Sequence, residues 1–85
     1  MTKTIRSPGH EALCDALIAA RKQAGLTQDQ LAALLNQHQS FVARVESGER
    51  RIDVVELIVL ARALRTDSVN LLAAAEASTE PDHQI

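Results

Sequence analysis

The fold of this chain is decided by one stretch, GLTQDQLAALLNQHQSFVARVESGERR, which runs from Gly25 to Arg51. Within it, Thr27 is a favourable helix N-cap, and Gln30 can reach back to the amide of that cap, which completes a capping box. The pattern predicts one helix from Gln28 to Leu35 and a second from His38 to Ser47. Two short helices joined by a turn of about three residues have the outline of a helix-turn-helix.

Helix signals continue on both sides of this stretch. Upstream, apolar residues recur at three-to-four spacing and a glycine follows the last of them. Downstream, Asp53 and Glu56 repeat the capping box, and Asp67 can cap one more helix. The expected additional helices span about Gly9 to Ala24, the segment after Asp53 to about Arg65, and Ser68 to roughly Ala77.

The composition fits an all-α domain. Hydrophobic residues make up 46% of the 85 residues, but aromatic residues only 1%, so the core volume must come from aliphatic side chains. We expect a flexible arm over residues 1–8, one domain over residues 9–77, and a disordered acidic tail over residues 78–85. The single Cys14, the lack of an apolar run that could span a bilayer and the absence of a signal peptide favour a cytoplasmic protein.

The charge is unevenly distributed along the chain. The formal net charge is −2, yet residues 1–65 hold all nine Lys and Arg and only seven of the eleven acidic residues. The last 20 residues carry the other four acids and no Lys or Arg. This is a weak electrostatic signal for a nucleic-acid partner, so geometry and dimerisation would have to supply much of the affinity.

The surface predicted for the third helix is suited to a DNA groove. Val42 and Val45 define its apolar side, because successive side chains rotate by about 100° around a helix. The opposite side is small, polar and singly basic, whereas a solvated helix face more often carries several Lys and Glu. Arg, Gln and Ser are side chains that hydrogen-bond base edges. The residues pointing outward or to the flanks are Gln39, Ser40, Phe41, Ala43, Arg44 and Ser47.

The stretch from Gly25 to Arg51 resembles the Cro/C1 or Xre-type helix-turn-helix family, and the likeness extends over most of residues 11–75. The resemblance implies a five-helix, lambda-repressor-like domain that binds double-stranded DNA. Matched by position, it implies base contacts by Gln39, Ser40, Phe41 and Arg44. Phosphate contacts are expected from Gln28, Ser47, Arg50 and Arg51. Arg21 and Glu46 match an ion pair that ties the first helix to the end of the recognition helix.

The turn departs from the family pattern, which often has glycine, then an apolar residue, then Ser, Thr or Pro. This chain has Asn36, Gln37 and His38 at those positions. One recognition helix reads only a few base pairs, so we expect a homodimer that binds an inverted repeat and acts as a repressor. The expected dimer interface lies on the last helix, at Val69, Leu72 and Ala73.

Two alternatives remain open from the sequence. The first is an antitoxin-like protein that regulates its own operon and also binds a protein partner. The second is a helix-turn-helix used only for protein interaction. His10 and Cys14 lie four residues apart, as metal ligands on a helix can, but no second pair completes a site. No nucleophile–base grouping, phosphate loop or small-molecule site is evident, so we expect neither a cofactor nor an enzyme.

Overall fold

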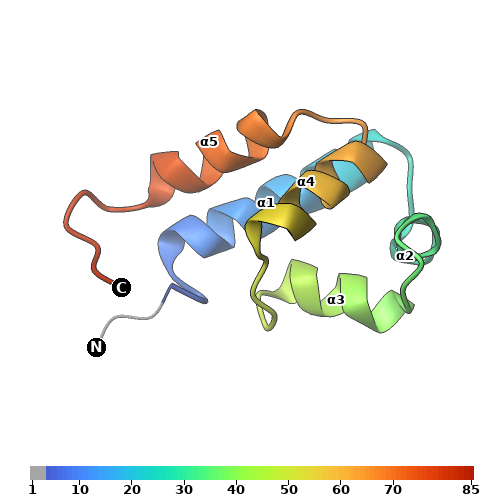
Figure 1. Ribbon diagram of the computed structural model, residues 1–85, viewed down its shortest axis with the longest axis horizontal. Helices are drawn as coiled ribbons and strands as arrows, with labels where there is room; N and C mark the ends of the chain where they lie inside the picture. The colour runs from blue at the N-terminus through green and yellow to red at the C-terminus, as the bar shows by residue number, and fades with distance from the viewer. Residues whose placement is uncertain (1–3) are drawn as a thin grey trace.

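The computed structural model describes residues 4–85, and these form five helices without a strand. The prediction of an all-α, five-helix domain is confirmed. In Figure 1, α3 lies along one edge of the molecule and α5 along the opposite edge, with α1 and α4 between them. The helices are α1 (Pro8–Gln23), α2 (Gln28–Leu34), α3 (Gln39–Ser47), α4 (Val54–Ala63) and α5 (Ser68–Ser78).

The helix starts follow the capping signals. Both capping boxes are present, with reciprocal side-chain and backbone hydrogen bonds at Thr27 and Gln30 and at Asp53 and Glu56. The first helix begins at Pro8, one residue earlier than expected, because the Ser7 hydroxyl accepts the His10 amide at 3.3 Å. Proline is favourable in this first turn, where its missing N–H would have no helical partner.

Four of the helices are followed within two residues by a residue with positive φ: Gly25, Asn36, Gly48 and Arg65, with φ of 73°, 55°, 84° and 56°. At the end of α4, the Thr66 amide donates to Ala61 O at 2.9 Å and the Arg65 amide to Arg62 O at 3.2 Å. These two bonds form the Schellman arrangement. α4 therefore ends at Ala63, two residues before the approximate end expected at Arg65, and the left-handed residue that follows its cap is an arginine.

The turn between α2 and α3 also differs slightly from expectation. Asn36 takes the positive φ predicted for it. α2 ends at Leu34, with Leu35 as its C-cap. His38 is the N-cap of α3 rather than its first residue, because its backbone is extended (φ −75°, ψ 154°) and its side chain makes no cap hydrogen bond.

The core is aliphatic and draws on all five helices. The Cys14 thiol donates to Val45 O at 3.3 Å, which joins α1 to α3, and burial raises the pKa of this thiol. Phe41 and Leu26 pack against the cluster from its rim. The buried cluster consists of Leu17, Leu31, Ala32, Val42, Val45, Leu60, Ala61, Leu64 and Leu71.

The first turn of α1 lies against the end of α5. A Cβ on buried Gly9 would overlap Thr79 Oγ1 and lie 3.1 Å from Ala75 O, so the first turn of α1 needs glycine to approach the end of α5. Part of the predicted arm, residues 1–3, lies outside the described residues. The expected disorder of residues 78–85 stays a prediction, although Ser78 closes α5. No helix in the described part is long and apolar enough to cross a membrane.

Candidate nucleic-acid interface

The exposed side of α3 carries small and polar side chains, because its two valines face the core. Val42 and Val45 are buried and turn the opposite side of the helix to solvent. Ser40, Arg44 and Ser47 are all exposed there. The Ser47 hydroxyl donates to Arg44 O at 3.2 Å, a local bond that it would exchange in order to donate to a phosphate oxygen.

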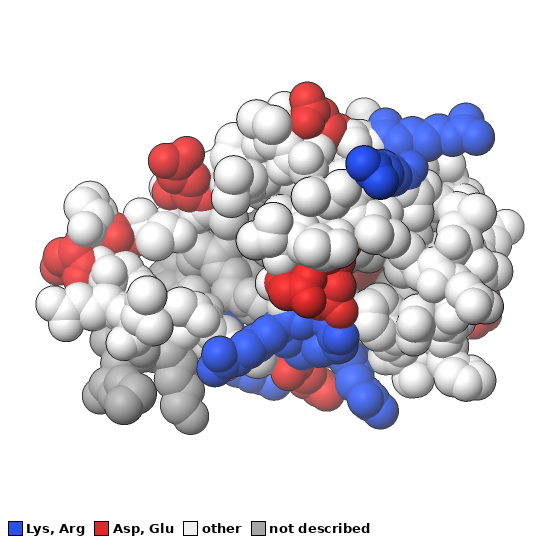
Figure 2. Space-filling view, viewed as in Figure 1, with Lys and Arg blue, Asp and Glu red and all other residues white. Residues whose placement is uncertain are grey.

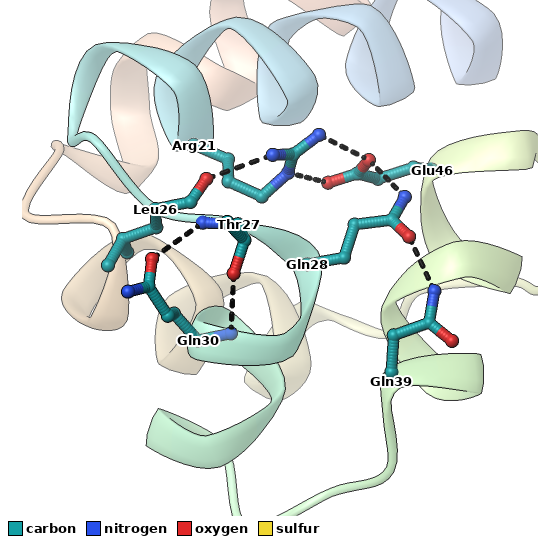
Figure 3. A network of polar contacts seen from close by, with 7 residues as sticks. All are labelled: Arg21, Leu26, Thr27, Gln28, Gln30, Gln39 and Glu46. Carbon is teal, nitrogen blue, oxygen red and sulfur yellow. Dashed lines mark hydrogen bonds and ion pairs between the residues drawn. The ribbon is translucent and has the colours of Figure 1, made fainter.

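A chain of four polar side chains fastens this helix to α1 and α2 (Figure 3). We call Arg21, Glu46, Gln28 and Gln39 the polar network. Arg21 Nε lies 2.6 Å from Glu46 Oε2, and Arg21 Nη2 lies 3.1 Å from Glu46 Oε1. Gln28 Nε2 donates to the same Oε1 at 2.9 Å, and Gln39 Nε2 donates to Gln28 Oε1 at 2.6 Å. The polar network therefore runs from α1 to the last turn of α3 and back, through α2, to its first residue.

The ion pair in this network is largely shielded from water. The Arg21 and Glu46 side chains are only 12% and 7% exposed. Arg21 Nη1 also donates to Leu26 O at 2.9 Å, and the hydrogen bond to Glu46 raises the pKa of Arg21. With both charges paired and hydrogen-bonded, this geometry holds the angle between α1 and α3 firmly.

The polar network also sets which way the exposed amide groups face. Because Gln28 donates to the Glu46 carboxylate, its oxygen is turned toward Gln39 and accepts from that amide nitrogen. Gln39 then keeps one N–H and its carbonyl oxygen for an outside partner. A donor beside an acceptor is the pattern that complements the major-groove edge of adenine.

A second cluster joins Phe41 of α3 to the loop of residues 49–52, which leads into α4. We call Phe41, Arg50 and Glu56 the loop clamp. Arg50 Nη1 and Nη2 lie 2.9 and 2.7 Å from the two Glu56 carboxylate oxygens. Arg50 Nη1 also donates to Arg51 O at 2.8 Å, and Arg50 Cζ lies 4.7 Å from the centre of the Phe41 ring. The hydrogen bond from Arg50 lowers the pKa of Glu56, and the amide of Asp53 lowers it further.

This placement changes the interpretation of two predicted contact residues. The sequence places Phe41 at the flank of the outward face, but the ring is half-buried, packs against the core and has Arg50 over it. Arg50 is predicted as a phosphate ligand, but its two terminal nitrogens already have partners within the protein. Arg51 is exposed.

Charge gathers around the same region of the surface. In Figure 2, one group of Lys and Arg side chains lies at the lower edge, near α3 and the loop after it, with acidic side chains above and below it, and a second group lies at the upper right, near the end of α4. The cationic edge is therefore narrow and partly neutralised. This fits the small excess of cations counted in residues 1–65.

The predicted dimer residues lie on the opposite edge of the molecule, on α5. Only Leu71 of this helix is buried. Val69 and Leu72 are 64% and 57% exposed, and Ala73 is exposed as well. The structure thus leaves an apolar strip on α5 uncovered, at positions spaced to lie on one side of the helix.

The His10 and Cys14 pair gains no further ligand in the structure. Within residues 4–85, no group of three or more His, Cys, Asp or Glu is placed so that it could hold a metal ion. Cys14 is instead a buried core residue that hydrogen-bonds Val45.

Sequence reasoning missed the role of Glu56 as the partner of Arg50. The residue was accounted for by the capping box, and its side chain does accept the Asp53 amide at 3.0 Å. One signal in the sequence could have revealed this role: the capping box of α4 has a glutamate, whereas the matching position of α2 has a glutamine, Gln30. A capping box works with either residue, so the carboxylate points to an additional cationic partner.

Comparison with known proteins decides the family. The profile described as Helix-turn-helix matches residues 17–70, which contain α2, α3, α4 and the polar network. The chain belongs to this helix-turn-helix family. Its type is Cro/C1 or XRE, as the sequence predicts, and the family consists of DNA-binding transcription regulators that are not enzymes.

Three relatives of this helix-turn-helix regulator illustrate the likeness. An XRE-family like protein from Pseudomonas syringae pv. tomato str. DC3000 is 46% identical, with a TM-score of 0.75 over 85% of this chain and 88% of that one. The restriction-modification controller protein C.AhdI from Aeromonas hydrophila is 32% identical, with a TM-score of 0.68 over 73% of this chain and 94% of that one. Control protein C.SmaI from Serratia marcescens is 36% identical over 62 residues, which are 73% of this chain and 74% of the relative.

Proposed function

We propose that this regulator acts in the cytoplasm as a homodimer that binds an inverted-repeat operator and represses transcription by covering promoter DNA. The observation that carries the proposal is the exposed face of α3, whose first residue and last turn are held by the polar network, and whose Phe41 is held by the loop clamp. A rigidly held helix with small polar side chains can enter the major groove without rearrangement. Repression by occlusion needs no ligand-binding domain.

The proposed contacts divide into two classes. Base edges are read from α3, where Arg44 suits guanine and the donor–acceptor edge of Gln39 suits adenine. Phosphates are contacted from the ends of the helices and the following loop. The proposed base contacts are Gln39, Ser40 and Arg44, and the proposed phosphate contacts are Gln28, Ser47 and Arg51. Phe41 and Arg50, which pack on each other, are proposed to support the loop instead of contacting DNA.

Selection of bound sites from random duplex DNA tests this function. We expect an inverted repeat whose half-sites are centred about one turn of DNA apart, roughly 34 Å. Arg44→Ala should then relax discrimination at one base position in each half-site. Recovery of no preferred sequence at moderate salt would refute sequence-specific binding, and a single unrepeated motif would refute the symmetric dimer.

The homodimer is proposed to form through the exposed strip of α5. Val69, Leu72 and Ala73 are apolar, and Glu76 is the one charged residue in Ser68–Ser78. Two copies of this helix can therefore approach with little charge repulsion, and a two-fold axis makes one patch sufficient for both partners. A dimer converts binding of the second half-site into an intramolecular event.

Two exposed leucines provide a matched test of this interface. Leu72 on α5 is 57% exposed and Leu34 on α2 is 61% exposed, so neither substitution disturbs the core. Leu72→Asp should turn a dimer into a monomer in light scattering and lower operator affinity by about 100-fold, because the two half-sites are no longer linked. Leu34→Asp should leave both unchanged. If Leu72→Asp remains dimeric, the interface lies elsewhere.

The relatives favour one kind of target. C.AhdI is a restriction-modification controller protein and C.SmaI a control protein. We therefore propose restriction-modification genes as a candidate target of this regulator. The test compares the selected operator sequence with the promoters that lie next to the gene encoding this regulator. It also places the operator before a reporter gene and measures whether the regulator lowers expression of that reporter. The antitoxin-like alternative stays a prediction, for which co-purification of a protein partner is the test.

A further inference from the structure

We propose that Glu56 is a positioning residue of the DNA interface, which holds Arg50 against Phe41 and so fixes the loop that presents Arg51. Arg50 then acts through its neighbours rather than as a phosphate ligand. The inference rests on the proposed binding of DNA through α3 and adds a specificity role for a residue of α4. It starts from three contacts that join α3, the loop and α4.

The first step is the number of restraints on Arg50. Its two terminal nitrogens meet both oxygens of Glu56, at 2.9 and 2.7 Å, and one of them also meets Arg51 O at 2.8 Å. The flat guanidinium lies over the Phe41 ring, with Cζ 4.7 Å from the ring centre. Planar bidentate pairing and stacking on an aromatic ring leave this side chain one geometry.

The second step is the backbone of the loop. The amides of Glu49 and Arg50 both donate to Arg44 O, at 3.1 and 3.3 Å, which fixes how the chain leaves α3. The Arg50 side chain then grips the next carbonyl, that of Arg51. With the loop held on both sides, the Arg51 side chain projects from a defined point, and it is exposed.

The third step is a comparison of the two capping boxes. In α2, Gln30 Oε1 accepts the Thr27 amide at 2.9 Å, and in α4, Glu56 Oε1 accepts the Asp53 amide at 3.0 Å. A glutamine therefore caps a helix in this fold as well as a glutamate does. Only a carboxylate can pair each of its two oxygens with an N–H group of Arg50, because the amide of glutamine has one oxygen and a nitrogen that donates. The charge at position 56 serves Arg50 rather than the cap.

The fourth step is the cost of using Arg50 on a phosphate. Its charge is already balanced by Glu56, so moving it would break two charge-assisted hydrogen bonds and uncover Phe41. The move would also leave the Glu56 carboxylate unpaired beside the polyanion. Among residues 4–85, no carboxylate lies within ion-pair distance of Arg51. Arg51 is therefore the cation of this loop that neutralises phosphate.

The decisive variant is the full chain carrying both Arg50→Gln and Glu56→Gln. It removes the loop clamp, keeps the net charge, and keeps an acceptor for the Asp53 amide. Binding to the selected operator and to a scrambled duplex is measured over a range of salt concentrations. We expect the ratio of the two affinities to fall roughly tenfold, which is about the effect of one mismatched base pair. The slope of log affinity against log salt should stay that of the natural chain.

Arg51→Gln is the matched control and should behave in the opposite way. Its salt slope should become less steep by about 0.9 for each phosphate that the variant no longer neutralises, with the affinity ratio unchanged. If the double variant instead shows a less steep salt slope, Arg50 is a phosphate ligand and the inference is wrong. If neither the ratio nor the slope changes, the loop clamp is merely structural and the inference is also wrong.

Two further measurements keep the outcomes separate. If the double variant is not folded by circular dichroism, Glu56→Gln alone is used, since it retains the cap, and only its affinity ratio is scored. An unchanged ratio there again overturns the inference. Failure of the proposed function itself would show in the natural chain, as selection of no DNA sequence.

Discussion

The two Arg–Glu pairs of this domain have the same chemistry and different surroundings. Arg21–Glu46 and Arg50–Glu56 are both bidentate, and each joins α3 or its loop to another helix. The first pair is 12% and 7% exposed, and the second is 36% and 30% exposed. Removing one partner of a shielded pair leaves an uncompensated charge, whereas water solvates the survivor of an exposed pair. The first pair should therefore govern stability, and the second mainly the geometry of the loop.

The largest expected effect is that of Glu46→Ala. It leaves the largely shielded Arg21 guanidinium without its carboxylate and removes the acceptor of Gln28. We expect a loss of about 3–5 kcal/mol in the free energy of unfolding, measured by urea denaturation. Glu49→Ala, at an exposed acid three residues further on, is the control and should change it by less than about 0.5 kcal/mol. If Glu46→Ala and Glu49→Ala lower the free energy of unfolding equally, the shielding of Glu46 from water does not govern stability.

Gln28→Ala should lower stability less than Glu46→Ala does, and it should also weaken binding. The variant leaves the buried ion pair intact but cuts its connection to Gln39. We expect operator affinity to fall, because Gln39 is no longer held and the proposed phosphate contact of Gln28 is lost, and the missing hydrogen bond to the Glu46 carboxylate to lower the free energy of unfolding by about 1.5–3 kcal/mol. Gln37→Ala, at an exposed glutamine in the turn, should leave affinity unchanged. A loss of stability as large as that of Glu46→Ala would mean that Gln28 belongs to the structural part of the network.

Glu56→Gln should affect stability less again. The cap is retained and the pair is about one-third exposed, so solvent screening limits the loss to about 1 kcal/mol or less. The melting temperatures of Glu56→Gln and Glu46→Gln are compared, because both variants make the same chemical change in the two ion pairs. If the two substitutions lower the melting temperature equally, exposure does not distinguish the pairs.

The smallest expected effect is on the acid side of the stability curve. Arg50 holds the pKa of Glu56 below its ordinary value, so the pair stabilises the fold fully above the unfolded value of about 4.3. This contribution is lost as the pH falls from about 4.3 through the lower pKa of the folded state. Urea denaturation between about pH 6 and pH 3 should show the natural chain converging on Glu56→Gln at the acid end. A constant difference across this range would contradict the assignment.

Local sequence was a reliable guide to where helices start in this chain. Thr27, Asp53 and Asp67 all cap helices as their patterns predict, because each cap bond joins residues no more than three apart. Helix ends were predicted less well. Gly25 and Gly48 end helices as expected, but α4 ends before Arg65, a residue with no sequence preference for positive φ. Leu64, the C-cap just before this residue, is buried in the core.

The sequence predicted only part of the site, because it reveals contacts between residues that are close along the chain. The outward face of α3 follows from the positions of Val42 and Val45, and helical rotation alone determines it. Phe41 and Arg50 could not be placed in this way, since their partners come from the loop and from α4.

The sequence by itself thus determined the helix starts, the polar face of α3 and the helix-turn-helix family, because these depend on neighbours along the chain. Only the tertiary structure decided that Arg50 is paired with Glu56 and that Gln39 is held by Gln28. Such contacts depend on how whole helices cross. The side chains involved are long and flexible, and their types alone allow many partners.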